Sequence, residues 1–331
     1  MTTNSAMLDE DSISLLSITP ENPLHRPSAH RLIRLAAVTA LVATVTGGPA
    51  GATLTAAATT YPTTAPMILN AVPPEDLLAN TRGICGGSFT IVIRNVGGAA
   101  GAIRYLDAAQ HCGVKAVLFF SSTVSGGTVY PSRVGALVRA VKNHPALYGY
   151  LSVKEPSWIG ISGWEIRSLY KAFKAADPGH PVVGLFGDIP HFGDTRNPYW
   201  TGMADIVMVD WYPVETASGG CSSYGTSYVP YGPKWYATKV YPKVHAVTPK
   251  APIWVMVQTH KYLAPSCHKK QRPSQALLNR QVREAFIYAH ASGIAFHTFS
   301  NVNYNMDERR DGTMVSWMKL ISTQVHAGTF Q

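Results

Sequence analysis

NHPALYGYLSVKEP, residues 143–156, is an apolar run that ends in a charged pair and a proline. Leucine, tyrosine, glycine and valine in one short run are typical of a strand buried on both faces, as in a parallel sheet. Pro156 bars further ladder pairing, so the strand should end beside Glu155. A carboxylate at the C-terminal end of such a strand lies where parallel α/β proteins build their active sites. The alternative is that Glu155 is simply the first solvated residue of a loop.

The rest of the chain repeats this pattern of an apolar run followed by a helical segment. Eight strands are predicted, at residues 67–72, 89–96, 114–121, 146–153, 181–186, 205–212, 253–258 and 293–299. Helices are predicted between and after them, at residues 101–111, 131–143, 162–176, 233–247, 273–292 and 312–326. Such alternation favours parallel pairing with right-handed crossovers. Eight repeats, without a glycine-rich dinucleotide fingerprint, predict an α/β fold with a single (β/α)8 barrel.

The N-terminal part of the chain reads as a leader rather than as part of the barrel. Basic residues, an apolar stretch from Leu35 to Val45 and the small-residue pattern at 50–52 follow one another in the order of a secretory signal peptide. The apolar stretch is shorter than the roughly 20 residues of a membrane span. We therefore expect a signal peptide at 1–52, a low-complexity Ala/Thr/Pro spacer at 53–66 and the barrel at 67–331. An uncleaved anchor is the alternative.

A protein of this kind would be secreted, monomeric and free of the membrane after cleavage. The formal net charge of +9 favours contact with anionic surfaces such as acidic glycans, and a basic surface that is simply solvated is the alternative. No nucleic-acid motif accompanies this charge, so a nucleic-acid partner is not expected. The histidines lack metal-site spacing, and we expect neither a metal nor a cofactor.

The four cysteines lack the C-x-x-C spacing of zinc and redox sites. An even number in an exported protein suggests disulfides. Cys85 and Cys112 flank the second strand and its helix at the N-terminal end of the barrel, whereas Cys221 and Cys267 follow the sixth and seventh strands at the other end. We therefore expect the bonds Cys85–Cys112 and Cys221–Cys267.

Candidate functional residues are the polar side chains where the predicted strands end. Glu155 follows the fourth strand, and Asp210 interrupts the otherwise apolar sixth strand, where a buried structural role is its alternative. Both are candidate catalytic residues. The remaining candidates would bind substrate: Lys154, Trp211, Tyr212, Gln258, His260, His297 and Asn301.

Four segments carry a resemblance to a known family: HPALYGYLSVKEP, DIVMVDWYPV, APIWVMVQTH and GIAFHTFS. They resemble the strand-four, six, seven and eight signatures of (β/α)8 glycoside hydrolases of the retaining clan A, over roughly residues 89–331. The resemblance implies that Glu155 is the general acid/base. It places the catalytic nucleophile near Gln258, and glutamine cannot serve as that nucleophile.

Three accounts of the activity follow from this departure. In the first, Glu155 and Asp210 act as a pair. The ends of two strands separated by one other strand lie roughly 9–10 Å from each other. The side chains could bring the two carboxyl groups to the ~6.5–9.5 Å separation of an inverting enzyme. In the second, the substrate supplies its own nucleophile, oriented by Asp210 and Tyr212. In the third, the barrel binds carbohydrate without cleaving it. Aromatic residues near the sixth strand could stack on sugar rings in all three.

Overall fold

The computed structural model describes residues 61–156, 159–187, 202–212, 215–217, 241–247, 249–260, 268–270, 272–297, 299–301, 306–307 and 312–331. Eight parallel strands close into a barrel in the order β1-β12-β10-β8-β7-β6-β3-β2. Their bounds are β1 Met67–Asn70, β2 Ile91–Val96, β3 Lys115–Phe120, β6 Leu147–Lys154, β7 Val182–Phe186, β8 Ile206–Trp211, β10 Ile253–Gln258 and β12 Gly293–His297. Each predicted strand is confirmed, with ends that differ by a few residues.

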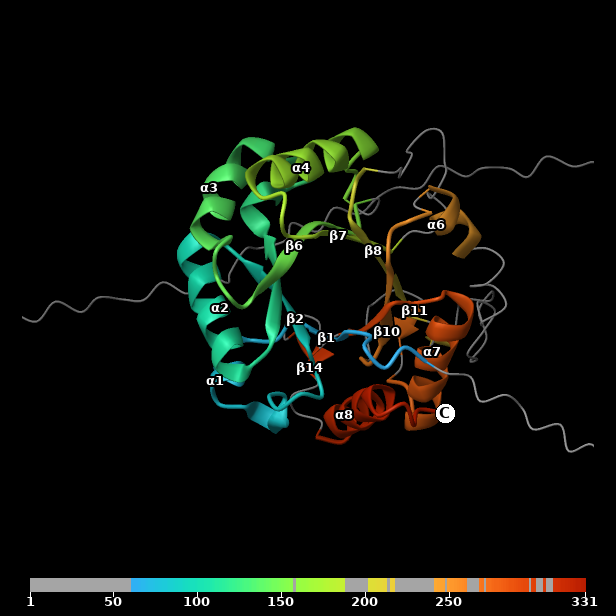
Figure 1. Cartoon of the computed structure of the whole chain (residues 1–331). Helices are drawn as coiled ribbons and strands as arrows, with labels where there is room; N and C mark the ends of the chain where they lie inside the picture. Colours follow the sequence, from blue (N-terminus) through green and yellow to red (C-terminus); the bar gives the residue numbers. More distant parts are fainter. Residues whose placement is uncertain are drawn as a thin grey trace, which may run out of the picture. The chain divides into compact units, whose positions relative to one another are not determined.

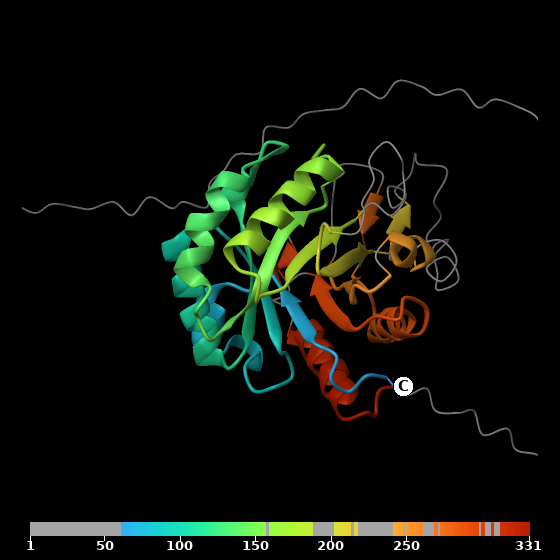
Figure 2. The same ribbon diagram turned by 45° about the horizontal axis from the view of Figure 1, so that its top comes forward.

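Helices surround the strands on the outside of the barrel (Figures 1 and 2). Their bounds are α1 Pro74–Leu78, α2 Ala99–Cys112, α3 Pro131–Val141, α4 Gly163–Ala176, α6 Tyr241–Val247, α7 Gln275–Tyr288 and α8 Gly312–His326, with 3-10 turns η1 Thr81–Gly83 and η2 Ser121–Thr123. Three short antiparallel pairs lie in the loops: β4 Val124–Ser125 with β5 Thr128–Val129, β9 Glu215–Ala217 with β11 His268–Lys270, and β13 Ser300–Asn301 with β14 Met306–Asp307. None of these pairs was predicted, because two- and three-residue strands carry no periodicity.

Local sequence signals fix the ends of several helices. Ser162 caps α4, and Glu165 completes a capping box with it. Pro131 stands at the first turn of α3, where its missing N–H costs no hydrogen bond. Gly113 ends α2 in the left-handed conformation at φ 73°, which glycine adopts without a steric penalty. These signals turn the chain sharply between helix and strand, as the repeating unit requires.

Two layers of apolar side chains hold the barrel together. One layer lies between strands and helices and includes Val153, Val207 and Phe173. The other fills the barrel interior and includes Leu151, Met208 and Met256. Because side chains alternate along a strand, these two layers tell which polar residues at the strand ends point inward.

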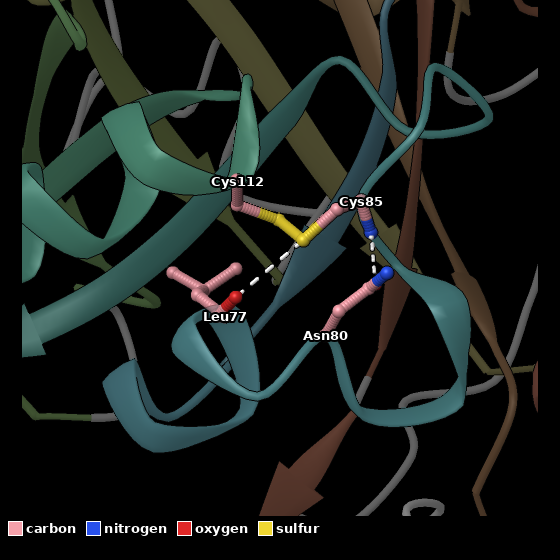
Figure 3. Close-up of a disulfide and its surroundings, with 4 residues drawn as sticks. All are labelled: Leu77, Asn80, Cys85 and Cys112. Atoms are coloured by element: carbon pink, nitrogen blue, oxygen red, sulfur yellow. Dashed lines mark hydrogen bonds between the residues drawn. A yellow bond between two sulfur atoms is a disulfide. The ribbon is translucent and has the colours of Figure 1, made fainter.

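The disulfide between Cys85 and Cys112 is present, as predicted, and spans 27 residues (Figure 3). Cys112 is the last residue of α2, just before β3, which places the bond at the N-terminal end of the barrel. Asn80 Oδ1 accepts a hydrogen bond from the Cys85 amide at 2.9 Å. The second predicted pair, Cys221 and Cys267, lies outside the described residues.

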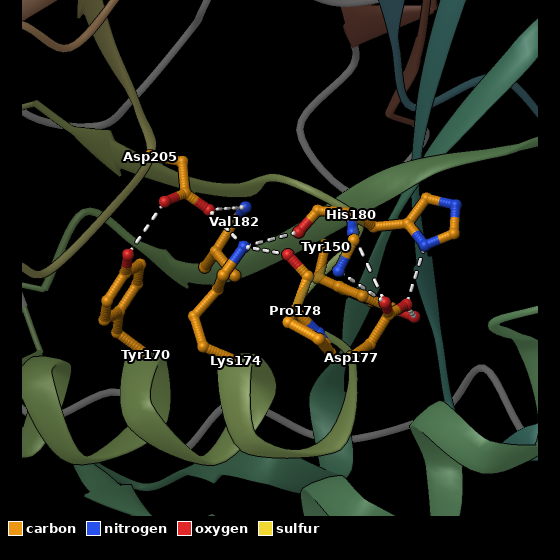
Figure 4. A network of polar contacts seen from close by, with 9 residues as sticks. Tyr150, Tyr170, Lys174, Asp177, Pro178, His180, Val182 and Asp205 are labelled. Carbon is orange, nitrogen blue, oxygen red and sulfur yellow. Dashed lines mark hydrogen bonds and ion pairs between the residues drawn. The ribbon is translucent and has the colours of Figure 1, made fainter.

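A polar network closes the same end of the barrel beneath β7 and β8 (Figure 4). Asp177 accepts from the Tyr150 hydroxyl and contacts His180 Nδ1, both at 2.7 Å. Asp205 accepts from the Tyr170 hydroxyl at 2.7 Å and pairs with Lys174 at 3.1 Å. These buried and half-buried contacts belong to the face of a barrel that supports stability rather than chemistry.

The segment before β1 packs on the barrel as far as it is described. The centroid of the Tyr61 ring lies 5.3 Å from that of the Phe286 ring and 5.4 Å from that of the Phe330 ring. Ala65 is buried. The expected signal peptide, residues 1–52, lies outside the described residues. Within the part of the chain that the structure describes, no helix combines the length and apolar character needed to cross a membrane.

Candidate active site

The C-terminal mouth of the barrel gathers inward-facing polar side chains from five strands. On β8, Ile206 and Met208 face the interior, so Asp210 two residues later does the same, and Tyr212 packs above the interior layer. The same alternation turns Gln258 of β10, His297 of β12 and Asn70 of β1 inward. Each of them stands two residues after a residue of the interior layer, namely Met256, Ala295 and Ile68. On β6, Val153 faces the helices, which turns Lys154 toward the interior. The predicted substrate-binding residues thus converge from strands far apart in the sequence.

Glu155 is held in an unusual backbone conformation directly after β6. Its φ is +46°, in the left-handed region that non-glycine residues rarely occupy. Its amide donates to the Leu185 carbonyl of β7 at 2.8 Å, which fixes the residue despite the strain. Strain of this kind is concentrated at functional sites. This conformation and its half-buried position keep Glu155 a candidate functional residue.

Gly187, just after β7, leaves the space in which Glu155 and Asp210 meet. A Cβ atom at this glycine would lie 2.7 Å from Asp210 Oδ1 and 2.9 Å from Glu155 Oε1. Both distances start from one point, so the two oxygens are no further apart than their sum, about 5.6 Å, and the two side chains share a hydrogen bond. No water fits between carboxyl groups in this contact, whereas an inverting pair keeps a gap of ~6.5–9.5 Å. The wide spacing of the first account is not what these side chains adopt.

Asp210 is the more deeply buried carboxyl group of this pair, and its surroundings favour the protonated form. Burial raises its pKa well above the usual value, and the charge and hydrogen bond of Glu155 raise it further. A hydrogen bond from Tyr212 and the charge of Lys154 act in the opposite direction and are smaller. Asp210 Oδ1 receives no hydrogen bond from a donor among the described residues. One proton shared between the two carboxyl groups accounts for both observations.

Two buried histidines and Tyr212 form a compact ring cluster beside the acidic pair. Tyr212 stacks on His297 with ring centroids 5.1 Å apart and meets His260 edge-on at 4.9 Å. Burial lowers the pKa of His260 to about 4, and it lowers that of His297 well below its ordinary value. Both rings are therefore neutral at pH 7.

The hydrogen-bond partners decide which ring nitrogen carries the proton. The Asn70 side-chain amide donates to His297 Nδ1 at 2.7 Å, which leaves the proton of His297 on Nε2. His260 Nδ1 donates to the His297 carbonyl at 2.9 Å, which leaves its Nε2 as an acceptor. The cluster thus combines one donor and one acceptor, the pair of functions that sugar hydroxyl groups require. Sequence reasoning missed Asn70, although its place two residues after inward-facing Ile68 could have found it.

Gln258 is buried and tied into the end of β10 by its own hydrogen bonds. Its backbone amide and carbonyl pair with the side chain of Gln281 at 3.0 and 3.2 Å, and its side-chain nitrogen donates to the His260 carbonyl at 3.2 Å. The position where the resemblance places a nucleophile therefore holds a neutral amide that supports the His260 segment.

Some predicted site residues lie beyond what the structure describes. Trp211 and Asn301 belong to β8 and β13, and their side chains are outside the described set. Among the described residues, no group of three histidine, cysteine, aspartate or glutamate side chains could hold a metal ion.

The comparisons with known proteins agree with this architecture. No family model matches the chain, and no curated protein matches it. Solved structures match at TM-scores just above 0.5. A GH5_18 variant from Streptomyces cattleya in complex with Manb1-4GlcNAc has 12% identity and a TM-score of 0.55, covering 78% of this chain and 80% of that one. The fold is that of (β/α)8 glycoside hydrolases.

Two β-galactosidases are similar to this chain in fold. That of psychrophilic Marinomonas ef1 has 10% identity and a TM-score of 0.53, covering 78% of this chain and 59% of its own. That of the Antarctic haloarchaeon Halorubrum lacusprofundi has 11% identity and a TM-score of 0.55, covering 78% and 57%. Identities this low support a shared fold only. The chemistry has to be inferred from the side chains at the C-terminal end of the barrel.

Proposed function

We propose that this protein is a secreted glycoside hydrolase that cleaves an extracellular poly- or oligosaccharide at the mouth of its barrel. The observation that carries the proposal is the contact between the half-buried Glu155 and the buried Asp210 at the C-terminal ends of β6 and β8. That end of a (β/α)8 barrel is where its catalytic groups lie. The carbohydrate complex of the Streptomyces cattleya protein, which shares the fold, is consistent with a sugar ligand.

In this proposal Glu155 is the general acid/base and Asp210 is its proton partner. The one proton that the pair shares passes from Glu155 to the glycosidic oxygen as the bond to the anomeric carbon breaks, and the water that completes the reaction returns a proton to the pair. Because Asp210 shares a proton with Glu155 at rest, it is not a free carboxylate nucleophile. Attack on the anomeric carbon then falls to a water molecule or to a neighbouring group of the substrate. Direct attack by water inverts the anomeric centre and participation of the neighbouring group retains it, so the anomer of the first product distinguishes the two routes.

The test compares single-atom changes in the two carboxyl groups on a broad glycoside panel. Glu155→Gln should lower kcat by about 10²–10⁴-fold while glycan binding persists. Asp210→Asn should lower kcat and flatten the pH profile, because the shared proton is lost. The control is Asp107→Asn, which removes one exposed carboxylate on α2 and should leave the rate unchanged. Equal rates for the wild type and Glu155→Gln would reject the assignment.

A second candidate function is carbohydrate binding without turnover. Gln258 favours it, because an amide stands where the resemblance places the nucleophile and is already engaged with the His260 carbonyl. Under this alternative the wild type binds glycans across the panel and releases no reducing sugar. The Glu155→Gln variant would then bind as the wild type does.

A further inference from the structure

The ends of β8, β10 and β12 bring the rings of Tyr212, His260 and His297 together at the mouth of the barrel. Tyr212 stacks on His297 with ring centroids 5.1 Å apart, and His260 meets both of these rings edge-on at 4.9 Å. His260 is 3% exposed and His297 is 8% exposed. Rings packed this tightly keep their orientation, so the direction of each ring nitrogen is set before a ligand arrives.

Hydrogen bonds within the protein occupy one nitrogen of each imidazole. The Asn70 side-chain amide donates to His297 Nδ1 at 2.7 Å, and His260 Nδ1 donates to the His297 carbonyl at 2.9 Å. Both rings are neutral at pH 7, because burial lowers their pKa values. His297 therefore carries its proton on Nε2 and offers a donor, whereas His260 Nε2 carries a lone pair and offers an acceptor.

The two Nε2 atoms remain available to a ligand. Within the part of the chain that the structure describes, neither makes a hydrogen bond, and neither is sealed from solvent as Thr259 Oγ1 is. A polar atom that is almost buried and has no partner is unfavourable, and a ligand that pairs with it removes this cost. The donor and the acceptor thus form a small prepared site beside the acidic pair.

Gln258 holds the acceptor of this site in position. Its side-chain nitrogen donates to the His260 carbonyl at 3.2 Å, and its backbone is fixed in turn by Gln281. The Thr259 amide donates to the His297 carbonyl at 2.9 Å, the same oxygen that accepts from the His260 ring. The residue at the position where the resemblance places a nucleophile therefore supports a ligand-facing ring.

Only a group that both accepts and donates a hydrogen bond can satisfy the two nitrogen atoms. A free hydroxyl does so, since its oxygen accepts from His297 and its hydrogen is donated to His260. A carboxylate or a sulfate has no hydrogen for His260, and an ether or ester oxygen can only accept. An ammonium has no lone pair for His297. Each of these substituents would leave one ring nitrogen unpaired.

We infer that His260 and His297 together recognise a free hydroxyl group of the sugar ring at the mouth, and that they restrict the substrate to rings left unsubstituted at that position. The inference takes its sugar ligand from the proposed function and adds a chemical requirement on that ligand. Sites built to hydrogen-bond a substrate hydroxyl discriminate strongly against the analogue that lacks it. Rings that are alkylated, esterified or oxidised at the recognised carbon are excluded.

The experiment measures affinity, so that it stands apart from the question of hydrolysis. The full chain carrying Glu155→Gln, which prevents cleavage during the measurement, is titrated by calorimetry at pH 7. The ligands are cellobiose, mannobiose and galactobiose, which differ in the orientation of single hydroxyl groups, and the monodeoxy and mono-O-methyl derivatives of each. For a disaccharide that binds, removing or methylating the recognised hydroxyl should weaken binding at least about tenfold.

Two substitutions then assign this hydroxyl to the histidines. His260→Asn keeps a donor for the His297 carbonyl and loses the acceptor, and His297→Asn keeps an acceptor for Asn70 and loses the donor. Each should weaken binding of the parent disaccharide at least about tenfold and leave the sensitive derivative nearly unchanged, because that derivative no longer makes the contact. His111→Asn is the control at an exposed position on α2 and should change neither affinity.

Three results would overturn the inference: none of the three disaccharides binds, every derivative binds as its parent does, or the histidine variants weaken parent and derivative equally. The derivative series needs no change at either histidine, so the inference can fail even if those variants do not fold. Failure of the proposed function looks different, because the same hydroxyl dependence then persists while the chain with Glu155 intact releases no reducing sugar. Cleavage that is indifferent to His260 and His297 would leave the hydrolase standing and remove this inference alone.

Discussion

Acidification should unfold this protein in part through the buried histidines at the mouth. His260 is neutral in the folded protein, with a pKa lowered by burial from 6.5 to about 4. In the unfolded chain the same ring takes up a proton below pH 6.5. A histidine with a lowered folded pKa contributes stability that is fully present above the unfolded pKa and is lost as the pH falls toward the folded one. The affected window is therefore pH 6.5 to 4.

The size of the effect follows from the same two values. Each tenfold difference in proton affinity is worth about 1.4 kcal/mol, so a fall from 6.5 to about 4 corresponds to roughly 3 kcal/mol at the acid end of the window. His297 acts in the same direction. The raised pKa of Asp210 acts in the opposite direction and is common to the wild type and to a variant at position 260.

Urea unfolding of the wild type and His260→Asn at pH 7, 6, 5 and 4 measures this contribution. The asparagine amide can still donate to the His297 carbonyl but does not titrate. We expect the variant to be less stable at pH 7, and the gap to narrow by about 3 kcal/mol on going to pH 4. The control is His111→Asn, which removes an exposed histidine at the end of α2. Parallel curves for the wild type and His260→Asn would refute the reasoning.

Other perturbations test other parts of the molecule. Reduction of the disulfide, or replacement of Cys85 and Cys112 by serine, should lower the free energy of unfolding by about 3–4 kcal/mol, since 27 residues of chain are released; equal melting temperatures with and without reductant would contradict this. Asp177→Asn should lower the free energy of unfolding by about 1–3 kcal/mol at pH 7. Burial raises the pKa of Asp177, its hydrogen bonds outweigh that effect and lower it, and the substitution weakens those hydrogen bonds. Thermal melts measure the loss, and an unchanged melting temperature would mean that the network beneath β7 is dispensable. Gly187→Ala should separate the two mouth carboxyl groups and lower kcat at least about tenfold while the melting temperature changes little; an active Gly187→Ala enzyme would show that their contact is not needed.

The sequence was sufficient to predict the barrel because each strand corresponds to a separate apolar run in the sequence. The helix ends at Gly113 and Ser162 follow from local rules that act within one turn. A disulfide across one strand and one helix was predictable for the same reason. Each of these features depends on residues close together in the chain.

The contact between Glu155 and Asp210 was not predictable in this way. Strand spacing alone places their backbones roughly 9–10 Å apart. The side chains meet because the residue between them, Gly187 just after β7, is a glycine that occupies none of the intervening space. The roles of Asn70 and Gln281 likewise depend on contacts between distant segments. Sequence patterns identify which residues face the mouth and cannot measure the gaps between them.

The Cys85–Cys112 bond also bears on the order in which the molecule assembles. It joins two residues within a single strand–helix unit near the start of the barrel, whereas closure pairs Met67 with Ile294 at its end. During synthesis from the N-terminus, the chain can therefore form this disulfide in its first strand–helix unit long before the last barrel strand has been made. In a reducing compartment this disulfide does not form, and the incomplete barrel exposes unpaired strand edges without it. Recombinant yield should accordingly depend on the redox state of the compartment chosen for production.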